Sequence, residues 1–205
     1  MEKFFALKEN KQTTIINASL SCFGRYGYDK ASINDIAVEA GISKASVFQY
    51  FGSKKQLYAY LLDYAGKTIL ESFRQEDFNE DTDLFDRVLA SSFMEAKILE
   101  KNPYLSQFIV KAWTETTDEV HDTLAEFRKK TSTFRKDFVL QKSDMKKFKN
   151  PNDAEAVSQI LMLMAEGYVA RFQKDANIGY DLVMEEFQNM MEAMRRNFYK
   201  EEYLL

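Results

Sequence analysis

The stretch ASINDIAVEAGISKASVFQYFGSKK, residues 31–55, decides how the chain is expected to fold. Ser32 is a favourable helix N-cap, and Asp35 follows three positions later, which is a capping-box-like pair. The apolar pair Ile36 and Ala37 comes directly after it. This order of residues predicts a short helix that begins at about residue 32 and ends at about residue 40.

A tight turn and a second short helix are expected next. Gly41 would end the first helix, because glycine readily adopts the left-handed conformation found after helix C-termini. Ser43 can cap a helix from Lys44 to about Phe51, which Gly52 would end. A helix, a glycine-containing turn and a second helix form the helix-turn-helix arrangement, whose second helix enters the major groove of DNA.

The second helix has an inward and an outward face. Val47 and Phe51 are four positions apart and can pack inward. The outward side chains are Lys44, Ala45, Ser46, Phe48, Gln49 and Tyr50. Charged, hydroxyl, amide and small apolar groups of this kind bind phosphates and base edges or touch thymine methyl groups. No acidic residue lies between Glu39 and Asp63, so the surface would not repel phosphates. The alternative is a helical hairpin with ordinary solvated lysines.

A dense set of residues between positions 15 and 64 has the pattern of a known domain. The set consists of Ile15, Ile16, Ala18, Phe23, the Gly27-Tyr28-Asp29 turn, Ser32, Ile36-Ala37, Ala40-Gly41-Ile42-Ser43-Lys44, Tyr50-Phe51, Ser53-Lys54 and Leu57. It resembles the N-terminal DNA-binding domain of the TetR family of bacterial transcriptional regulators. The resemblance favours DNA binding over the solvated-hairpin alternative.

The resemblance also implies which side chains meet DNA. Backbone phosphates would be contacted by Ser32, Ser43, Tyr50 and Lys54. Base edges would be approached by Lys44, Ala45, Ser46 and Gln49. This chain departs from the family at two positions, because Phe48 replaces the usual tyrosine and its phosphate-contacting hydroxyl, and Ala45 stands where glycine is frequent. Both departures leave the operator sequence open.

The composition predicts an all-α protein. Among 205 residues, a hydrophobic content of 45% excludes a disordered chain, and only 7 Gly and 2 Pro interrupt long helical periodicities. Further helices are expected at about residues 8–26, 53–74, 84–100, 103–113, 118–141, 153–174 and 181–199, with a charged loop at 143–153. The predicted domains are a helix-turn-helix domain at 1–52, a linking helix at about 53–74, and a helical ligand-binding and dimerisation domain at 75–205.

The charge is divided unevenly along the chain. The net charge is −4, but residues 1–67 hold 9 Lys and Arg against 6 Asp and Glu, which gives +3. Residues 68–205 hold 19 against 26, which gives −7. The basic N-terminal part is called the head and the acidic remainder the body. This division fits a protein in which only the head meets DNA.

Other function classes find little support in the sequence. Cys22 is the only cysteine, so no disulfide forms within the chain and a reducing cytoplasm is expected, with a core role more natural than redox sensing. His121 has no Cys or His at metal-ligand spacing. No signal peptide, membrane span, nucleophile motif or phosphate-binding loop is recognisable. We therefore expect no membrane, no metal, no cofactor and no catalytic residue.

The two C-terminal helices carry a signal for self-association. Between Val157 and Phe172 the chain is apolar on nearly all sides, and such a helix must be covered all round. Two such helices from each of two chains would form a four-helix bundle, which is the dimer interface typical of the resembled family. A core helix within a monomeric bundle is the alternative.

The resemblance implies that the body encloses a site for a small effector. Methionine and aromatic side chains suit an adaptable apolar cavity, although they are more often core. The candidate pocket residues are Phe93, Phe108, Trp113, Phe127, Met164 and Tyr168. Glu95 and Glu166 could face a cationic ligand or form ordinary salt bridges. The resulting hypothesis is a homodimeric repressor released from a palindromic operator by an apolar or amphipathic effector. The alternative is a DNA-binding protein whose body binds another protein.

Overall fold

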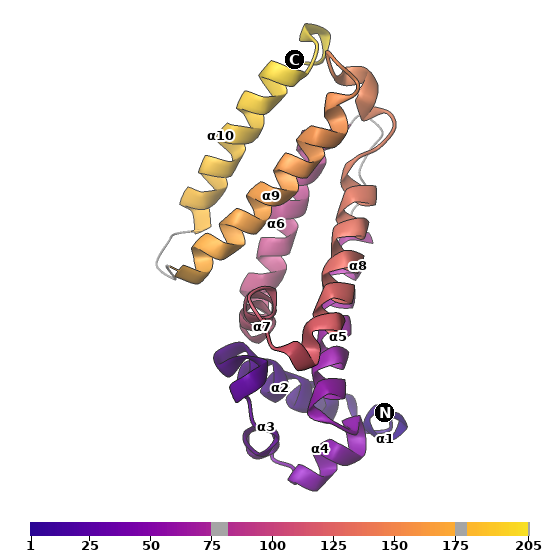
Figure 1. The fold of residues 1–205 in the computed structure, drawn as a ribbon, viewed down its shortest axis with the longest axis vertical. Helices are drawn as coiled ribbons and strands as arrows, with labels where there is room; N and C mark the ends of the chain where they lie inside the picture. The colour runs from indigo at the N-terminus through magenta and orange to yellow at the C-terminus, as the bar shows by residue number, and fades with distance from the viewer. Residues whose placement is uncertain (75–81, 175–179, 205) are drawn as a thin grey trace. The chain divides into compact units, whose positions relative to one another are not determined.

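The computed structural model describes residues 1–74, 82–174 and 180–204 (Figure 1). Its α-helices are α1 (Glu2–Phe5), α2 (Glu9–Lys30), α3 (Ile33–Glu39), α4 (Lys44–Phe51), α5 (Lys54–Arg74), α6 (Leu84–Lys101), α7 (Pro103–Trp113), α8 (His121–Val139), α9 (Asp153–Lys174) and α10 (Tyr180–Phe198). Short 3-10 segments are η1 (Asp118–Val120), η2 (Asp144–Lys147) and η3 (Glu201–Tyr203). No β-strand occurs in the described ranges, so the predicted all-α class is confirmed.

The expected helices are present, with two differences at the N-terminus. The short helix α1 was not expected, because its four residues carry no capping or periodic signal. Helix α2 continues to Lys30 rather than ending near Tyr26, since the chain kinks at Gly27 with φ 74° and resumes a helical turn. The glycine therefore bends the helix instead of ending it.

The chain forms two compact units, which are described separately. Unit 1 comprises residues 1–74 and 95–131, and unit 2 comprises residues 75–94 and 132–205. This division reflects how compactly the segments pack and does not test the predicted functional domains. The functional boundaries predicted after residues 52 and 74 stay predictions.

Unit 1 is built around the contact between α2 and α7. An ideal Cβ on Gly24 would lie 3.0 Å from the backbone nitrogen of Phe108, so the absent side chain allows the two helices to approach closely. The Tyr58 ring lies edge-on to both Phe23 and Phe108, with centroid distances of 5.0 and 5.3 Å. These buried rings join α2, α5 and α7 in one core, which supports the helix-turn-helix segment.

Unit 2 has a second core formed by α6, α9, α10 and the segment that precedes α9. Figure 1 shows α9 and α10 beside each other, and their facing side chains are buried together. The cluster consists of Leu84, Phe85, Val88, Phe148, Ala154, Val157, Leu161, Met184, Phe187, Met191 and Tyr199.

The segment expected as a charged loop, 143–153, contains no α-helix before Asp153, where α9 begins, and it packs against this core. The Asp144 carboxylate is buried, pairs with Arg87, and accepts the backbone N–H groups of Leu84 at 3.1 Å and Gln141 at 2.8 Å. Phe148 is fully buried and forms an isolated bridge with Tyr199. The segment is a loop as expected, and its buried carboxylate is stable because several donors and a counter-charge surround it.

Candidate nucleic-acid interface

Helix α3 and the turn after it have the expected local geometry. The Ser32 hydroxyl accepts the Asn34 N–H at 3.1 Å and caps the helix. At the other end Gly41 has φ 60°, its N–H donates to Val38, and the Ile42 N–H donates to Ala37 at 2.9 Å. This pair of bonds is a Schellman motif, which fixes the angle at which α4 departs.

Two serines, Ser43 and Ser46, form hydrogen bonds with each other at the start of α4. The Ser43 hydroxyl accepts the Ser46 N–H at 3.0 Å, and the two hydroxyl oxygens lie 2.8 Å apart. Because one hydroxyl donates to the other, a single hydroxyl hydrogen of the pair is left to donate outward. Both residues were predicted to contact DNA, and their first role in the structure is to cap α4.

The two faces of α4 are divided as the sequence predicts. Val47 is 1% exposed and Phe51 is 3% exposed, so both belong to the core. The exposed side chains are Lys44, Ala45, Phe48 and Gln49, and those of Ser46 and Tyr50 are half-buried. Ser32 is also half-buried, and Ser43 is exposed. The structure thus leaves the predicted base-reading side chains on the outside of α4.

A contact that the sequence analysis missed supports α4 from behind. Phe4 of α1 is fully buried, with its ring centroid 4.8 Å from that of Phe51 and 6.3 Å from that of Tyr50. Tyr60 of α5 lies edge-on to Phe4 at 5.5 Å. The only sequence signal for this contact was the apolar pair Phe4-Phe5 near the start of the chain, which has no periodicity.

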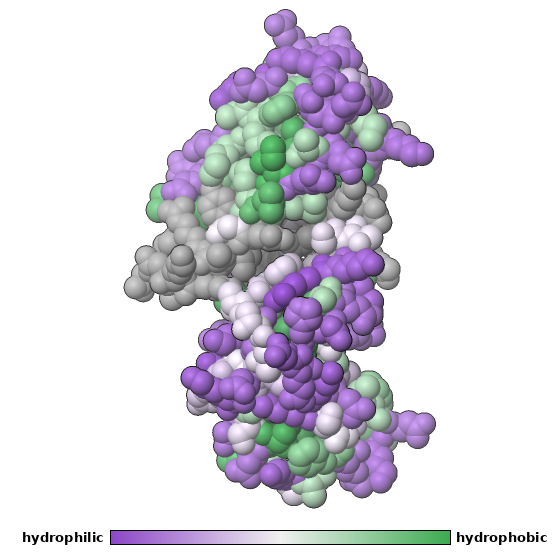
Figure 2. Space-filling model, in the orientation of Figure 1, coloured by the Kyte–Doolittle hydropathy of each residue, from purple (hydrophilic) through white to green (hydrophobic). Residues whose placement is uncertain are grey.

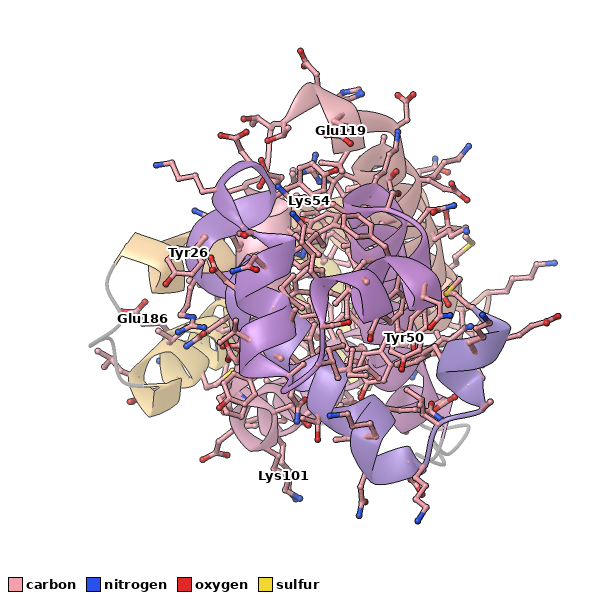
Figure 3. The ribbon with its side chains drawn as sticks, turned by 90° about the horizontal axis from the view of Figure 1, so that it is seen from below. Tyr26, Tyr50, Lys54, Lys101, Glu119 and Glu186 are labelled. Carbon is pink, nitrogen blue, oxygen red and sulfur yellow. The ribbon has the colours of Figure 1, made fainter. Side chains whose placement is uncertain are left out.

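Lys54 lies just after α4 and is held by the last turn of α2. Its Nζ donates to the Asp29 carbonyl at 3.1 Å and lies 4.7 Å from the centre of the Tyr28 ring. An ammonium group has three donors, so Lys54 can still bind a phosphate in this position. Figure 3 shows this end of unit 1 from below, with Tyr50 and Lys54 labelled.

The candidate effector residues are distributed over both units. In unit 1, Phe108 is fully buried against Phe23 and Tyr58, while Trp113 and Phe127 are half-buried. The unit 2 candidates are Phe93, which is 46% exposed, and Met164, which is half-buried. The side chains of Tyr168, Glu95 and Glu166 lie outside the described residues. The pocket stays a prediction.

The remaining candidates for chemistry have ordinary surroundings. Cys22 is buried, and burial raises the pKa of its thiol, which keeps it protonated as expected of a core residue. His121 is exposed beside Asp122, with 3.3 Å between Nδ1 and Oδ1. The residues whose side chains are described contain no cluster of three or more His, Cys, Asp or Glu suited to a metal ion. No helix in the described ranges combines the length and the apolar character needed to cross a membrane.

Transcriptional regulators are found among the solved structures that share this fold. A TetR family transcriptional regulator from Chloroflexus aurantiacus J-10-FL has a TM-score of 0.70 and 24% identity, with 98% of each chain covered. The transcriptional regulator FadR from Bacillus subtilis, in complex with stearoyl-CoA, has a TM-score of 0.67 and 16% identity, with 87% of this chain and 96% of that chain covered. Because both identities are below 25%, these structures show that the fold is shared and nothing further.

Sequence comparison agrees with the fold. The uncharacterized HTH-type transcriptional regulator YuxN of Bacillus subtilis is 26% identical over 195 residues, which cover 91% of this chain and 65% of YuxN. The negative transcriptional regulator IcaR of the Staphylococcus aureus biofilm operon icaADBC is 31% identical over 71 residues, which cover 33% of this chain and 38% of IcaR. The chain thus spans less than two thirds of the length of either relative. These relatives are regulators, which agrees with the prediction that the chain is not an enzyme.

Residues 15–61 match the family described as "Bacterial regulatory proteins, tetR family", and these residues include α3, α4 and the turn between them. The Chloroflexus regulator, which is a TetR family protein, shares the fold over nearly the whole chain. The helix-turn-helix segment of this chain thus matches the tetR family of bacterial regulatory proteins, and the chain shares its fold with TetR family regulators.

Proposed function

We propose that the protein is a homodimeric repressor that binds a palindromic DNA operator through α4 and is released from it by a small apolar or amphipathic effector. The observation that carries the proposal is the outer face of α4. It presents Lys44, Ala45, Phe48 and Gln49 to solvent, in a stretch without a carboxylate from residue 40 to residue 62. Such a face can enter the major groove without repelling phosphates.

Different side chains of this face have different tasks. The Gln49 amide can donate to and accept from one base, which suits the bidentate recognition of adenine. Lys54 is held by Tyr28 and Asp29 beside the end of α4, which suits a phosphate contact that positions the helix without reading sequence. Phe48 is 41% exposed and can touch a thymine methyl group.

The proposed dimer uses α9 and α10. One side of each helix is buried in the core of unit 2, but Ile160 and Leu163 on α9 are 43% and 66% exposed. On α10, Leu182 is 55% exposed and Met190 is 41% exposed. Figure 2 shows apolar surface in the region of α9. A second copy would cover these side chains, and a two-fold dimer reads a two-fold operator, with one half-site for each subunit.

The proposed effector has an apolar part. The Bacillus subtilis FadR structure that shares this fold holds stearoyl-CoA, a ligand with a long acyl chain and a polar head. This chain places aromatic and methionine side chains in the helices of its body, which suit such a ligand. Release requires that the effector bind the released state more tightly than the DNA-bound state, since equal affinities would shift nothing.

The test is selection from a random-sequence duplex library at fixed salt, followed by sequencing. We expect a palindromic consensus, and its loss when a fatty acid or an acyl-CoA is added. Gln49→Ala should relax discrimination at one base pair of each half-site, at a cost of about 1–3 kcal/mol there.

Lys54→Ala is the matched control in the same selection. It should weaken binding to all sequences and lower the salt slope by about one for each half-site, with the consensus kept. If no site is enriched, operator binding is refuted and a body that binds another protein becomes the better hypothesis. If a consensus is found that Gln49→Ala leaves unchanged, the base-reading role of Gln49 is refuted.

A further inference from the structure

The Glu115 carboxylate joins the turn after α7 to the last turn of α2. Glu115 Oε2 accepts the backbone N–H of Tyr28 at 2.7 Å, across 87 positions of sequence. Its other oxygen accepts the N–H groups of Thr116 and Thr117, both at 3.1 Å, and the Thr117 hydroxyl at 2.6 Å. Burial alone would raise the pKa of Glu115, but these hydrogen bonds outweigh it and hold the pKa below its usual value. The carboxylate is therefore ionised at neutral pH.

The α2 side of this contact depends on a backbone kink. Gly27 has φ 74°, a conformation that favours glycine, and its bend precedes the Tyr28 N–H that meets Glu115. An ideal Cβ on Gly27 would lie 3.0 Å from Glu115 Oε2 and 3.0 Å from Lys111 Cε. The site has room for a glycine and a carboxylate together, but for little more.

The turn that carries Glu115 is itself fixed from α8. Arg128 Nη2 donates to the carbonyls of Ala112 at 3.2 Å, Trp113 at 2.9 Å and Glu115 at 3.2 Å. These carbonyls lie at the C-terminal end of α7 and just beyond it, where helix carbonyls have no intrahelical donor. The Glu115 carboxylate is thus presented from a turn whose backbone is tied down, rather than from a loose loop.

The α2 turn that Glu115 holds is also joined to the first residue of α5, which follows α4, the proposed reading helix. Lys54, three residues after Phe51, donates to the carbonyl of Asp29 and lies over the ring of Tyr28. The two residues 28 and 29 are therefore held on one side by Glu115 and on the other by Lys54. Glu115 thus makes a polar contact between the α7–α8 turn and the segment against which α4 and α5 pack.

We propose that Glu115 is a positioning residue for operator recognition, which fixes the orientation of the helix-turn-helix segment and so limits the half-site separations that the dimer accepts. The inference rests on the proposed function, since it needs a dimer with two reading heads. Recognition helices of a dimer must reach half-sites about one DNA turn apart. A head that can pivot about residues 28 and 29 would reach neighbouring separations as well.

The test uses the full chain and Glu115→Gln. Both Glu115 oxygens accept hydrogen bonds, so an amide of the same size must turn its NH2 group toward N–H donors on one side or the other. The matched control is Glu126→Gln, because Glu126 is an exposed residue of α8 whose pair with Lys130 lies in solvent. Affinity is measured on duplexes that carry the selected half-sites at the preferred separation and at one and two base pairs more or less.

We expect Glu115→Gln to keep the half-site consensus and to lose about tenfold of the discrimination against displaced half-sites, the factor that corresponds to one charge-assisted hydrogen bond. Glu126→Gln should behave as the unaltered protein. Equal weakening at every separation would show a merely structural role and overturn the proposal, and so would unchanged discrimination. If the unaltered protein selects no consensus, the proposed function fails first, and this result is distinct from the other two.

A second measurement without DNA covers the case in which the variant binds too weakly to compare. Amide hydrogen exchange should be about tenfold faster at Tyr28 in Glu115→Gln, with the exchange of α4 amides near that of the unaltered protein. Unchanged exchange at Tyr28 would show that the hydrogen bond does not hold the turn, and would overturn the proposal.

Discussion

Replacing Phe4 by alanine tests whether α1 supports the reading helix. Phe4 is fully buried, and its ring contacts Phe51 at 4.8 Å and Tyr60 at 5.5 Å between centroids. Phe51 is the last residue of α4, so the removed ring would leave the end of that helix without its partner. We expect a loss of stability in unit 1 and weaker binding to any selected operator.

The expected loss in the free energy of unfolding follows from the burial of Phe4 and from its position in the short helix α1. Burying a phenylalanine contributes about 1.5–3 kcal/mol, and each well-placed ring pair adds about 0.5–1.5 kcal/mol. A Phe→Ala change within a closed core costs about 3–5 kcal/mol, because a cavity remains. Helix α1 has 4 residues and can undock rather than leave a cavity. We therefore expect a loss of about 2–3 kcal/mol in the free energy of unfolding.

The neighbouring residue provides a matched control. Phe5 has the same side chain on the same helix but is 56% exposed, and its edge-on contacts with Phe4 and Tyr60 lie partly in solvent, so Phe5→Ala should lower the free energy of unfolding by about 1 kcal/mol or less. Denaturant unfolding measures both variants, and amide hydrogen exchange shows whether the loss is local to α4. If Phe4→Ala and Phe5→Ala behave alike, α1 does not stabilise the reading helix and the reasoning is refuted.

Three further predictions concern other contacts. Asp144→Asn should lower the free energy of unfolding by about 3–5 kcal/mol in urea, because Arg87 loses its buried counter-charge, and a loss below about 1 kcal/mol would contradict this. Gly41→Ala should lower the free energy of unfolding by about 1–2 kcal/mol through backbone strain alone, since φ is +60° and nothing lies within 4 Å of the added Cβ. Thermal unfolding measures this loss, and an unchanged Tm would refute the prediction. The lowered pKa of Glu115 means that its carboxylate stabilises the folded state above the unfolded pKa of about 4.5. The stability difference between the unaltered protein and Glu115→Gln should thus be constant near neutral pH and shrink as the pH falls below that value; a difference that grows in acid would be the contrary result.

The helix-turn-helix segment could be predicted almost to the residue because its signals are local. Ser32 and Ser43 cap helices that begin one residue later, and Gly41 ends α3 with the expected positive φ. The inward positions Val47 and Phe51 are four apart, so helical periodicity alone assigns them to the core. Each of these inferences needs only a few consecutive residues.

The contacts that orient this segment could not be predicted, since they join residues far apart in sequence. Phe4 meets Phe51, and Glu115 meets Tyr28, without any local pattern that pairs them. The burial of Asp144 within the expected loop could not be predicted for the same reason, because its partner Arg87 lies 57 positions away. Periodicity tells which face of a helix is buried but not which distant residue covers it. The DNA contacts and the effector pocket remain predictions for a related reason, since each depends on a molecule that the chain alone does not specify.

The family match and the supporting contacts occupy different parts of the chain, and this separation has a consequence for recognition. The match covers residues 15–61, whereas Phe4 and Glu115 lie outside it. Base identity is expected to depend on Gln49 within the matched segment, and the orientation of α4 is expected to depend on residues beyond it. Two relatives with similar reading helices can therefore prefer the same half-site and yet require different separations between half-sites. If the proposed function and the proposed role of Glu115 hold, an effector need not touch α4 to release it, because a change at the turn that carries Glu115 would alter the orientation of α4 at the cost of one hydrogen bond.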